Sequence, residues 1–370
     1  MINDLYTVFT IALASVLFSF GLLFYSLCRN AETPVYKTAL RMMTFAYCFF
    51  GLVNVLEMWS RSSYPNNDDV LLFQAVTLII AVSQAFLFTY TLILLIHTAY
   101  VTRKRVVCEL VVLSTLSAAL VVIYFILHAT WIKLSVYIFI LFYICLLIRY
   151  TRLFVITYRN CLQKMDNFFS GREADNLRWV KFSFYAALSI GLLALTASLA
   201  PTIHVGIFGS VIYLLFYLYF AIRMIKYGFF YKKIESALTD DDIQTEPSGD
   251  DKKTLPASIV ENMERKLNVW IGEKQFLQSG ITIEDVAAYI GTNRRYLSEH
   301  INSVKGKTFR QWISELRIEE AKNLMRQRPD MTLNDIALQV GYVDKSNLIR
   351  QFSRQTNLSP TQWKQKTSET

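Results

Sequence analysis

Charged residues are scarce in this chain of 370 residues. Asp, Glu, Lys and Arg supply 18% of it, whereas soluble domains carry roughly a quarter. Hydrophobic residues make up 53% of the chain, and this apolar excess ends near Tyr231. The composition therefore excludes one uniform soluble domain and predicts an apolar part of residues 1–230 followed by a polar part.

Cysteine and histidine are also few, with five and four residues. No CxxC pair occurs, so the sequence implies neither a disulfide framework nor a zinc site, and we expect free thiols. The chain has neither an HExxH motif nor a GxSxG motif, which argues against zinc-protease and serine-hydrolase chemistry. We expect no enzyme activity, no catalytic residues, no metal and no cofactor.

Long apolar runs dominate residues 1–230. A bilayer core needs roughly 20 apolar residues per helix, and seven runs approach or exceed that length. They cover residues 5–28, 38–59, 70–100, 106–127, 131–148, 180–203 and 207–225. We expect the first to be a retained span because it is too long for a signal peptide and no small-residue cleavage site follows. A transmembrane bundle of seven helices is predicted.

Positive charge alternates between the loops. Lys and Arg gather after the first, third, fifth and seventh runs, while the other loops carry few. Because cytoplasmic loops are enriched in Lys and Arg, the N-terminus is predicted outside and the C-terminus inside. Most of the chain's formal net charge of +9 lies in this part, so lipid topology explains it better than nucleic acid does.

Polar residues lie near the outer ends of several runs. One interpretation is an outward-facing ligand pocket, since ionisable groups at membrane depth are functional candidates. The alternative is that they are hydrated helix ends, with Trp59 and Trp131 in an interfacial belt. The candidate pocket residues are Asn54, Glu57, Gln74, His128 and His204.

Residues 231–258 are acidic and contain few large apolar side chains. A segment of this composition buries too little surface to fold, so we expect a flexible linker. A continuation of the seventh helix to about Leu238 is the alternative at its start.

Helical periodicity returns in residues 259–370. A stripe with Met263 and Trp270 precedes Thr282, which begins a capping box with Asp285. Gly291 is placed to end that helix, and a second short helix follows. The spacing is typical of a helix-turn-helix unit.

The same pattern recurs fifty residues later. Thr332 is the expected cap, Gly341 the turn, and Leu348 with Phe352 the inward pair. Residues 308–327 read as a helix that joins the two units. Two units in tandem with basic and amide side chains outward suit successive segments of a DNA major groove. The overall fold class is therefore all-α: a seven-helix transmembrane bundle plus a helical domain with two helix-turn-helix units.

Residues 282–364 resemble the DNA-binding domain of the AraC/XylS family of bacterial regulators. The most specific match is I-A-x-x-V-G-Y-x-D-x-S-N-L-x-R-x-F-S-R-x-x-N-L-S-P-x-x-W, from Ile336 to Trp363. Leu348, Asn357 and Trp363 depart from the family pattern but keep size or conformation. The resemblance covers about 100 residues and implies promoter binding, with the first unit reading bases more closely.

We expect the outward side chains of both second helices to contact DNA. From the first unit these are Asn293, Arg294, Arg295, Ser298 and Glu299, and from the second Lys345, Ser346, Asn347 and Arg350. Contacts to phosphate are expected from Lys307, Arg310 and Arg354.

The chain is accordingly predicted to be a multi-pass protein of the bacterial inner membrane, with its DNA-binding domain in the cytoplasm. The expected partners are promoter DNA, membrane lipid, RNA polymerase, an unknown small-molecule or peptide ligand, and a second copy in a homodimer. The leading interpretation is a receptor that couples a signal to promoter binding. The alternatives are a passively tethered regulator released by proteolysis, and a transporter or enzyme bundle with a fused regulatory domain.

Overall fold

A computed structural model describes residues 2–63, 70–126, 129–171, 173–199, 203–239 and 257–368. The regular elements in these ranges are all helices, which confirms the predicted all-α class. The chain divides into two compact units. The first comprises residues 1–161 and 177–243, and the second comprises residues 162–176 and 244–370.

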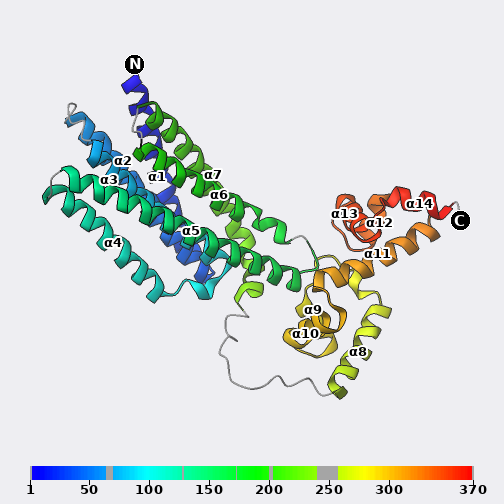
Figure 1. The fold of residues 1–370 in the computed structure, drawn as a ribbon. Coiled ribbons are helices and arrows are strands. Elements are labelled where there is room, and N and C mark those ends of the chain that lie inside the picture. The colour runs from blue at the N-terminus through cyan, green and yellow to red at the C-terminus, as the bar shows by residue number, and fades with distance from the viewer. Residues whose placement is uncertain are drawn as a thin grey trace. The chain divides into compact units, whose positions relative to one another are not determined.

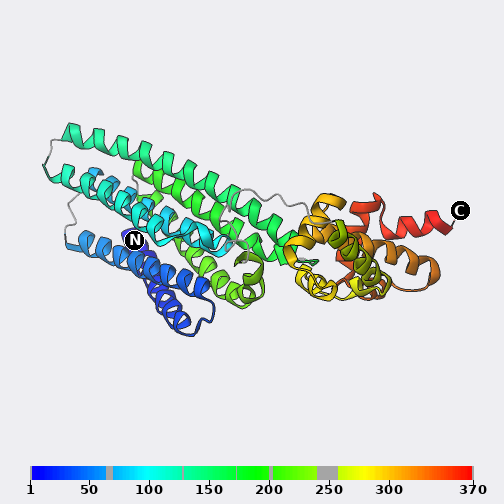
Figure 2. The same cartoon turned by 90° about the horizontal axis from the view of Figure 1, so that it is seen from below.

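Seven long helices build the first unit (Figures 1 and 2). They are α1 (Ile2–Asn30), α2 (Pro34–Ser63), α3 (Val70–Ile96), α4 (Arg103–Ile126), α5 (Ala129–Phe168), α6 (Arg178–Leu199) and α7 (Ile203–Thr239). The short 3₁₀ turns η1 (Thr98–Tyr100) and η2 (Glu173–Leu177) precede α4 and α6. All seven long helices contain a stretch long and apolar enough to cross a membrane.

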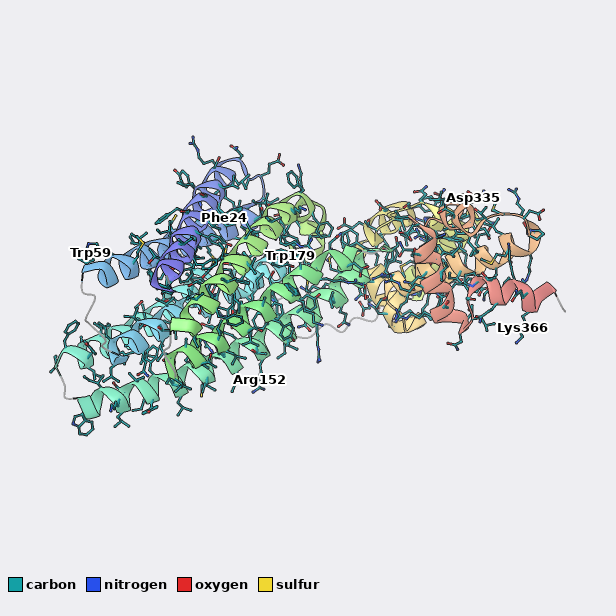
Figure 3. The ribbon with its side chains drawn as sticks, turned by 90° about the horizontal axis from the view of Figure 1, so that it is seen from above. Phe24, Trp59, Arg152, Trp179, Asp335 and Lys366 are labelled. Carbon is teal, nitrogen blue, oxygen red and sulfur yellow. The ribbon has the colours of Figure 1, made fainter. Side chains whose placement is uncertain are left out.

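Helix α3 is the centre of the bundle and α4 is at its edge. In its most apolar window, 78% of α3 is buried but only 11% of α4. The exposed side chains of α4 include Val111, Val122 and Phe125. Burial around most of α3 explains why its sequence is apolar on every face. In Figure 3, Phe24 and Trp179 lie within the bundle, whereas Trp59 lies near the end of α2.

Helix α5 continues twenty residues beyond the predicted end of the fifth run at Ile148. Hydropathy falls there because Arg149, Arg152 and Arg159 enter the sequence. Apolar residues nevertheless recur every three or four positions and keep one face buried. That stripe is Tyr150, Phe154, Tyr158, Cys161, Met165 and Phe168. The helix-type spacing is visible in the sequence and would have predicted the extension.

Helix α7 runs to Thr239 and therefore includes the start of the segment expected to be a linker. Ile234 and Leu238 are buried, as the alternative of a continued helix requires. Most of the remaining predicted linker, residues 240–256, lies outside the described residues.

The second unit holds seven further α-helices and a 3₁₀ turn. They are α8 (Ala257–Gly272), η3 (Gln275–Leu277), α9 (Ile283–Ile290), α10 (Arg294–Lys305), α11 (Phe309–Gln327), α12 (Leu333–Gln339), α13 (Lys345–Thr356) and α14 (Pro360–Ser368). Helix α11 joins the pair α9–α10 to the pair α12–α13 (Figure 1). Both pairs have buried apolar side chains, and the pair α12–α13 shares an apolar core with α11.

Arg317, on α11, is a buried charged residue, 2% exposed. Its guanidinium donates hydrogen bonds from Nε to the carbonyl of Phe276 at 2.9 Å and from Nη2 to that of Gln278 at 2.6 Å. The same guanidinium lies 5.5 Å from the ring centre of Tyr342. One charged side chain thus links η3 to α11 and to the turn after α12, a set of contacts that local sequence patterns do not predict.

Candidate nucleic-acid interface

The first helix-turn-helix unit begins at Thr282, as predicted. The Thr282 hydroxyl accepts a hydrogen bond from the backbone N–H of Asp285, and the Asp285 carboxylate accepts one from the backbone N–H of Thr282. Gly291 ends α9 at φ +72°, in the left-handed region that favours glycine. These local signals fix the angle at which α10 leaves the turn.

Helix α10 turns its apolar side chains inward and its polar side chains outward. Leu297 and Ile301 are buried. Arg295 and Glu299 are exposed, and Ser298 is half-buried. Asn293 caps the helix by accepting a hydrogen bond from the backbone N–H of Tyr296 at 2.9 Å.

The second helix-turn-helix unit repeats this construction. The Thr332 hydroxyl accepts from the backbone N–H of Asp335 at 3.2 Å, and Gly341 takes a φ of +83° in the turn. Leu348 and Phe352 on α13 are buried in the second core, as predicted. The two units share the same arrangement of cap, turn and buried pair.

The outward face of α13 is smaller than predicted. Lys345, Ser346 and Arg350 are exposed, but Asn347 is only 5% exposed. Its backbone N–H donates to the Asp344 carboxylate at 2.8 Å, and its amide lies 3.5 Å from the other carboxylate oxygen. The expectation that Asn347 faces outward is therefore wrong in this structure, because the Asp344 cap holds it against the helix. A base contact from Asn347 requires it to leave this position.

The three predicted phosphate contacts differ in their surroundings. Arg354 is exposed at the end of α13. Lys307 forms an ion pair with Glu315 at 2.6 Å. Arg310 forms one with Asp166 at 2.8 Å, and its side chain is 17% exposed.

Asp166 belongs to the segment 162–176, which begins in the last turns of α5 and ends before α6, and which is part of the second compact unit. Phe169 forms an antiparallel bridge with Thr282. The buried Ser170 donates to the carbonyl of Ile281 from its backbone N–H at 3.2 Å and from its hydroxyl at 2.6 Å. The segment is thus fixed to the start of the first helix-turn-helix unit by backbone pairing.

The same segment also contacts α10. The guanidinium of Arg294, the first residue of α10, lies 5.2 Å from the ring centre of Phe168, which is buried. Arg294 also lies 3.7 Å from Glu284, and its side chain is 21% exposed. Two predicted DNA contacts, Arg294 and Arg310, are therefore both engaged by residues 162–176, whereas Arg295 remains exposed.

His300 is a buried histidine on the inner side of α10. It is 3% exposed, and its Nε2 lies 3.5 Å from the Glu264 carboxylate. Burial lowers the pKa of His300 below its ordinary value, more than the nearby Glu264 raises it.

The ligand pocket predicted for residues 1–230 is separate from the helix-turn-helix units. Asn54 donates to the carbonyl of Phe50 in its own helix at 2.8 Å, and Gln74 is half-buried. The side chains of Glu57, His128 and His204 lie outside the described residues. The pocket that the five residues would form therefore stays a prediction.

The comparisons with known proteins concern the second compact unit, which contains both helix-turn-helix units. A protein-family model described as a helix-turn-helix domain matches residues 286–366. The transcriptional activator RhaR of Salmonella dublin is 26% identical over 110 residues, which are 30% of this chain and 38% of that protein. The probable transcription factor PqrA of Proteus vulgaris is 24% identical over 107 residues, which are 29% of this chain and 87% of that protein.

A third relative is an uncharacterized HTH-type transcriptional regulator of Pseudoalteromonas carrageenovora, 31% identical over 84 residues, with 23% of this chain and 49% of that protein covered. No solved structure matches the chain. The chain thus covers less than half the length of two of these three relatives. Its C-terminal part is a helix-turn-helix domain of the AraC type, as the resemblance predicted.

Proposed function

We propose that this protein is a membrane-bound transcription regulator in which the apolar unit controls promoter binding by the AraC-type domain. Sequence-specific DNA binding is supported by the two helix-turn-helix units and by the relatives named above. Membrane location is supported by the seven apolar helices and by the exposed apolar surface of α4. The alternation of loop charge supports a cytoplasmic DNA-binding domain and an N-terminus outside.

The observation that carries the proposed coupling is the engagement of Arg294 and Arg310 by segment 162–176. The contact with Phe168 holds the guanidinium of Arg294, and the ion pair with Asp166 partly neutralises that of Arg310, so each loses a favourable contact when it turns to a base edge or a phosphate. DNA and the segment therefore compete for the same two side chains. A signal that shifts the segment changes DNA affinity by the free energy of these contacts, which is the requirement for coupling between two sites.

The competition is tested by Asp166→Asn in the full-length protein in lipid nanodiscs. The amide keeps the shape of the side chain and removes its charge, so Arg310 is released while the β-bridge remains. Because exposed or half-exposed ion pairs contribute about 0.2–1 kcal/mol, affinity for promoter DNA should rise by a factor of about 1.4 to 5. Fluorescence anisotropy with a labelled promoter fragment measures the change.

Gln163→Ala is the matched control, since Gln163 is an exposed residue on the same helix. It should leave DNA affinity unchanged. If Asp166→Asn also leaves the affinity unchanged or lowers it, segment 162–176 does not compete with DNA and the proposed coupling is wrong. DNA binding by the AraC-type domain would stand.

A further inference from the structure

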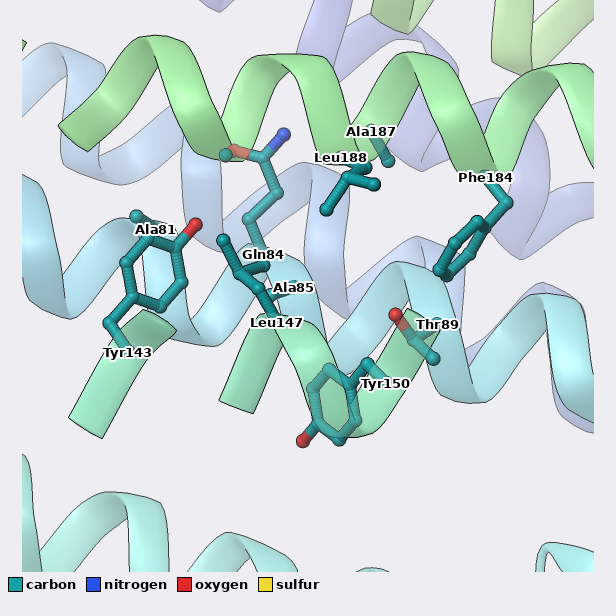
Figure 4. A pocket seen from close by; sticks show the side chains of 11 residues that line it. Ala81, Gln84, Ala85, Thr89, Tyr143, Leu147, Tyr150, Phe184, Ala187 and Leu188 are labelled. Carbon is teal, nitrogen blue, oxygen red and sulfur yellow. The ribbon is translucent and has the colours of Figure 1, made fainter. Parts of the chain in front are cut away.

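A small cavity lies inside the first unit, where α3, α5 and α6 meet (Figure 4). Its volume is about 20 Å³, slightly more than the roughly 10–15 Å³ that one water-sized group needs. The polar lining residues are Gln84, Thr89, Tyr143 and Tyr150, and the other seven are apolar. Because none of the lining side chains is charged, an occupant of this cavity is electrically neutral.

Two of the polar side chains have unsatisfied hydrogen-bonding capacity. Gln84 is 7% exposed and Tyr143 is fully buried. Within the described part of the chain, neither Nε2 of Gln84 nor the hydroxyl of Tyr143 has a hydrogen-bond partner. An unsatisfied polar group in a bilayer costs several kcal/mol because no water reaches it, so one cavity lined by two such groups requires an explanation.

Both groups are directed to the same end of the cavity. Figure 4 shows the Gln84 amide and the Tyr143 hydroxyl pointing toward α6. The hydroxyl of Tyr150 is directed away from that end and donates to the Glu109 carboxylate at 2.7 Å. The unsatisfied capacity is therefore concentrated between Gln84 and Tyr143.

Gly191 on α6 makes room for this arrangement. A Cβ atom at position 191 would lie 2.7 Å from the Tyr143 hydroxyl and 3.5 Å from Leu147. Glycine thus allows the hydroxyl to approach the backbone of α6, where a larger residue would displace it.

We infer that Gln84 and Tyr143 form a binding site for a single neutral oxygen atom, a hydroxyl or a carbonyl. The Gln84 amide donates one hydrogen bond to this oxygen and the Tyr143 hydroxyl donates a second. The oxygen comes either from a bound water molecule or from a small uncharged solute. The site lies where three helices meet, α3, α5 and α6. That its occupant is the signal sensed by the regulator rests on the function proposed above.

The test uses variants whose expected changes in Tm have opposite signs for an occupied and a dry cavity. Thermal unfolding of the full-length protein in lipid nanodiscs is measured for Gln84→Met, Tyr143→Phe and the double variant. If an oxygen bridges the two groups, each single variant lowers Tm by about 2–4 °C. The double variant then unfolds at nearly the same temperature as the lower of the two, because the first substitution already breaks the bridge.

A dry cavity gives the reverse result and overturns the inference. Removing an unsatisfied buried group would then raise Tm in each single variant, and the effects would add. Ser183→Ala is the reference for that behaviour, since the fully buried Ser183 hydroxyl also has no hydrogen-bond partner among the described residues but does not line the cavity.

Added formamide or methanol at non-denaturing concentration distinguishes the two sources of the oxygen. A Tm increase in the wild type that is lost in the double variant identifies a solute site. Coupled Tm losses without a solute response identify bound water. These readouts involve no DNA, so the site is tested independently of the regulation proposed through Asp166.

Discussion

Gly341 packs directly against the backbone of Leu277. A Cβ atom at position 341 would lie 2.9 Å from the carbonyl carbon of Leu277 and 3.1 Å from the guanidinium carbon of Arg317. The turn of the second helix-turn-helix unit is therefore pressed onto η3, the segment that precedes the first unit. Glycine is required here by its positive φ and by the lack of space.

We expect Gly341→Ala to destabilise the second helix-turn-helix unit by about 3 kcal/mol or more, from the left-handed strain and the clash together. Gly306→Ala is the matched control because Gly306 also has a positive φ, +64°, but has open space around it. That variant should cost only about 1–2 kcal/mol. Hydrogen exchange of α12 and α13 in the full-length protein measures both. Equal protection in the two variants would contradict the packing role of Gly341.

Arg317→Lys is expected to destabilise the second unit although it keeps the charge. A lysine ammonium cannot reproduce the planar fork that reaches the carbonyls of both Phe276 and Gln278. The loss of a buried hydrogen bond from a charged donor should cost about 1–3 kcal/mol. The urea dependence of tryptophan fluorescence follows this change, because Trp270 and Trp312 stack in the same unit with ring centres 5.8 Å apart. An unchanged unfolding midpoint would show that the two hydrogen bonds contribute little.

Arg295→Ala should weaken binding to a specific promoter site by about 1–3 kcal/mol and relax base preference there. Arg295 is exposed on the outward face of α10, the geometry expected of a base contact. Arg354→Ala should instead weaken binding to specific and scrambled DNA alike and reduce the salt dependence. Anisotropy titrations over a range of salt concentrations separate the two effects. If both variants change the two DNAs equally, Arg295 is not a base-reading residue.

The stability of the second unit should decrease as pH falls. His300 has a lowered pKa in the folded protein because of burial, so the unfolded chain binds more protons below its ordinary pKa of about 6.5. Stability rises with pH wherever the unfolded state binds more protons. The contribution of His300 to the free energy of unfolding is therefore fully present above about pH 7 and is lost as the pH falls below about 6.5. His300→Leu should flatten this dependence, as measured by urea midpoints between pH 5.5 and 7.5, and an unchanged slope would rule out His300 as its source.

Local features of the two helix-turn-helix units were predictable from sequence because they depend on neighbouring residues. Thr282 with Asp285 and the glycine at 291 specify a cap and a turn within one stretch of chain. Asn347 was misjudged because its spacing on α13 gave no account of the cap that Asp344 forms. The position of Arg317 depends on packing between segments forty residues apart, which periodicity does not encode.

The contacts of segment 162–176 are another case of long-range packing. Asp166 and Arg310 are 144 positions apart, and neither has an unusual local sequence. The extension of α5 to Phe168 was predictable, since its apolar residues keep a helical spacing. Likewise Gln84 stands out as an amide inside an apolar run, whereas its association with Tyr143 depends on how α3 and α5 pack.

Helix α11 has a consequence for the promoters that this protein can use. Its 19 residues give a length of about 28 Å at 1.5 Å per residue. Each inserted or deleted residue would rotate one DNA-binding half against the other by about 100°, so the helix fixes the phase as well as the distance between them. The two half-sites of a promoter must therefore keep a constant separation, and any mismatch with the roughly 34 Å helical repeat of DNA must be absorbed by bending or twisting of the DNA.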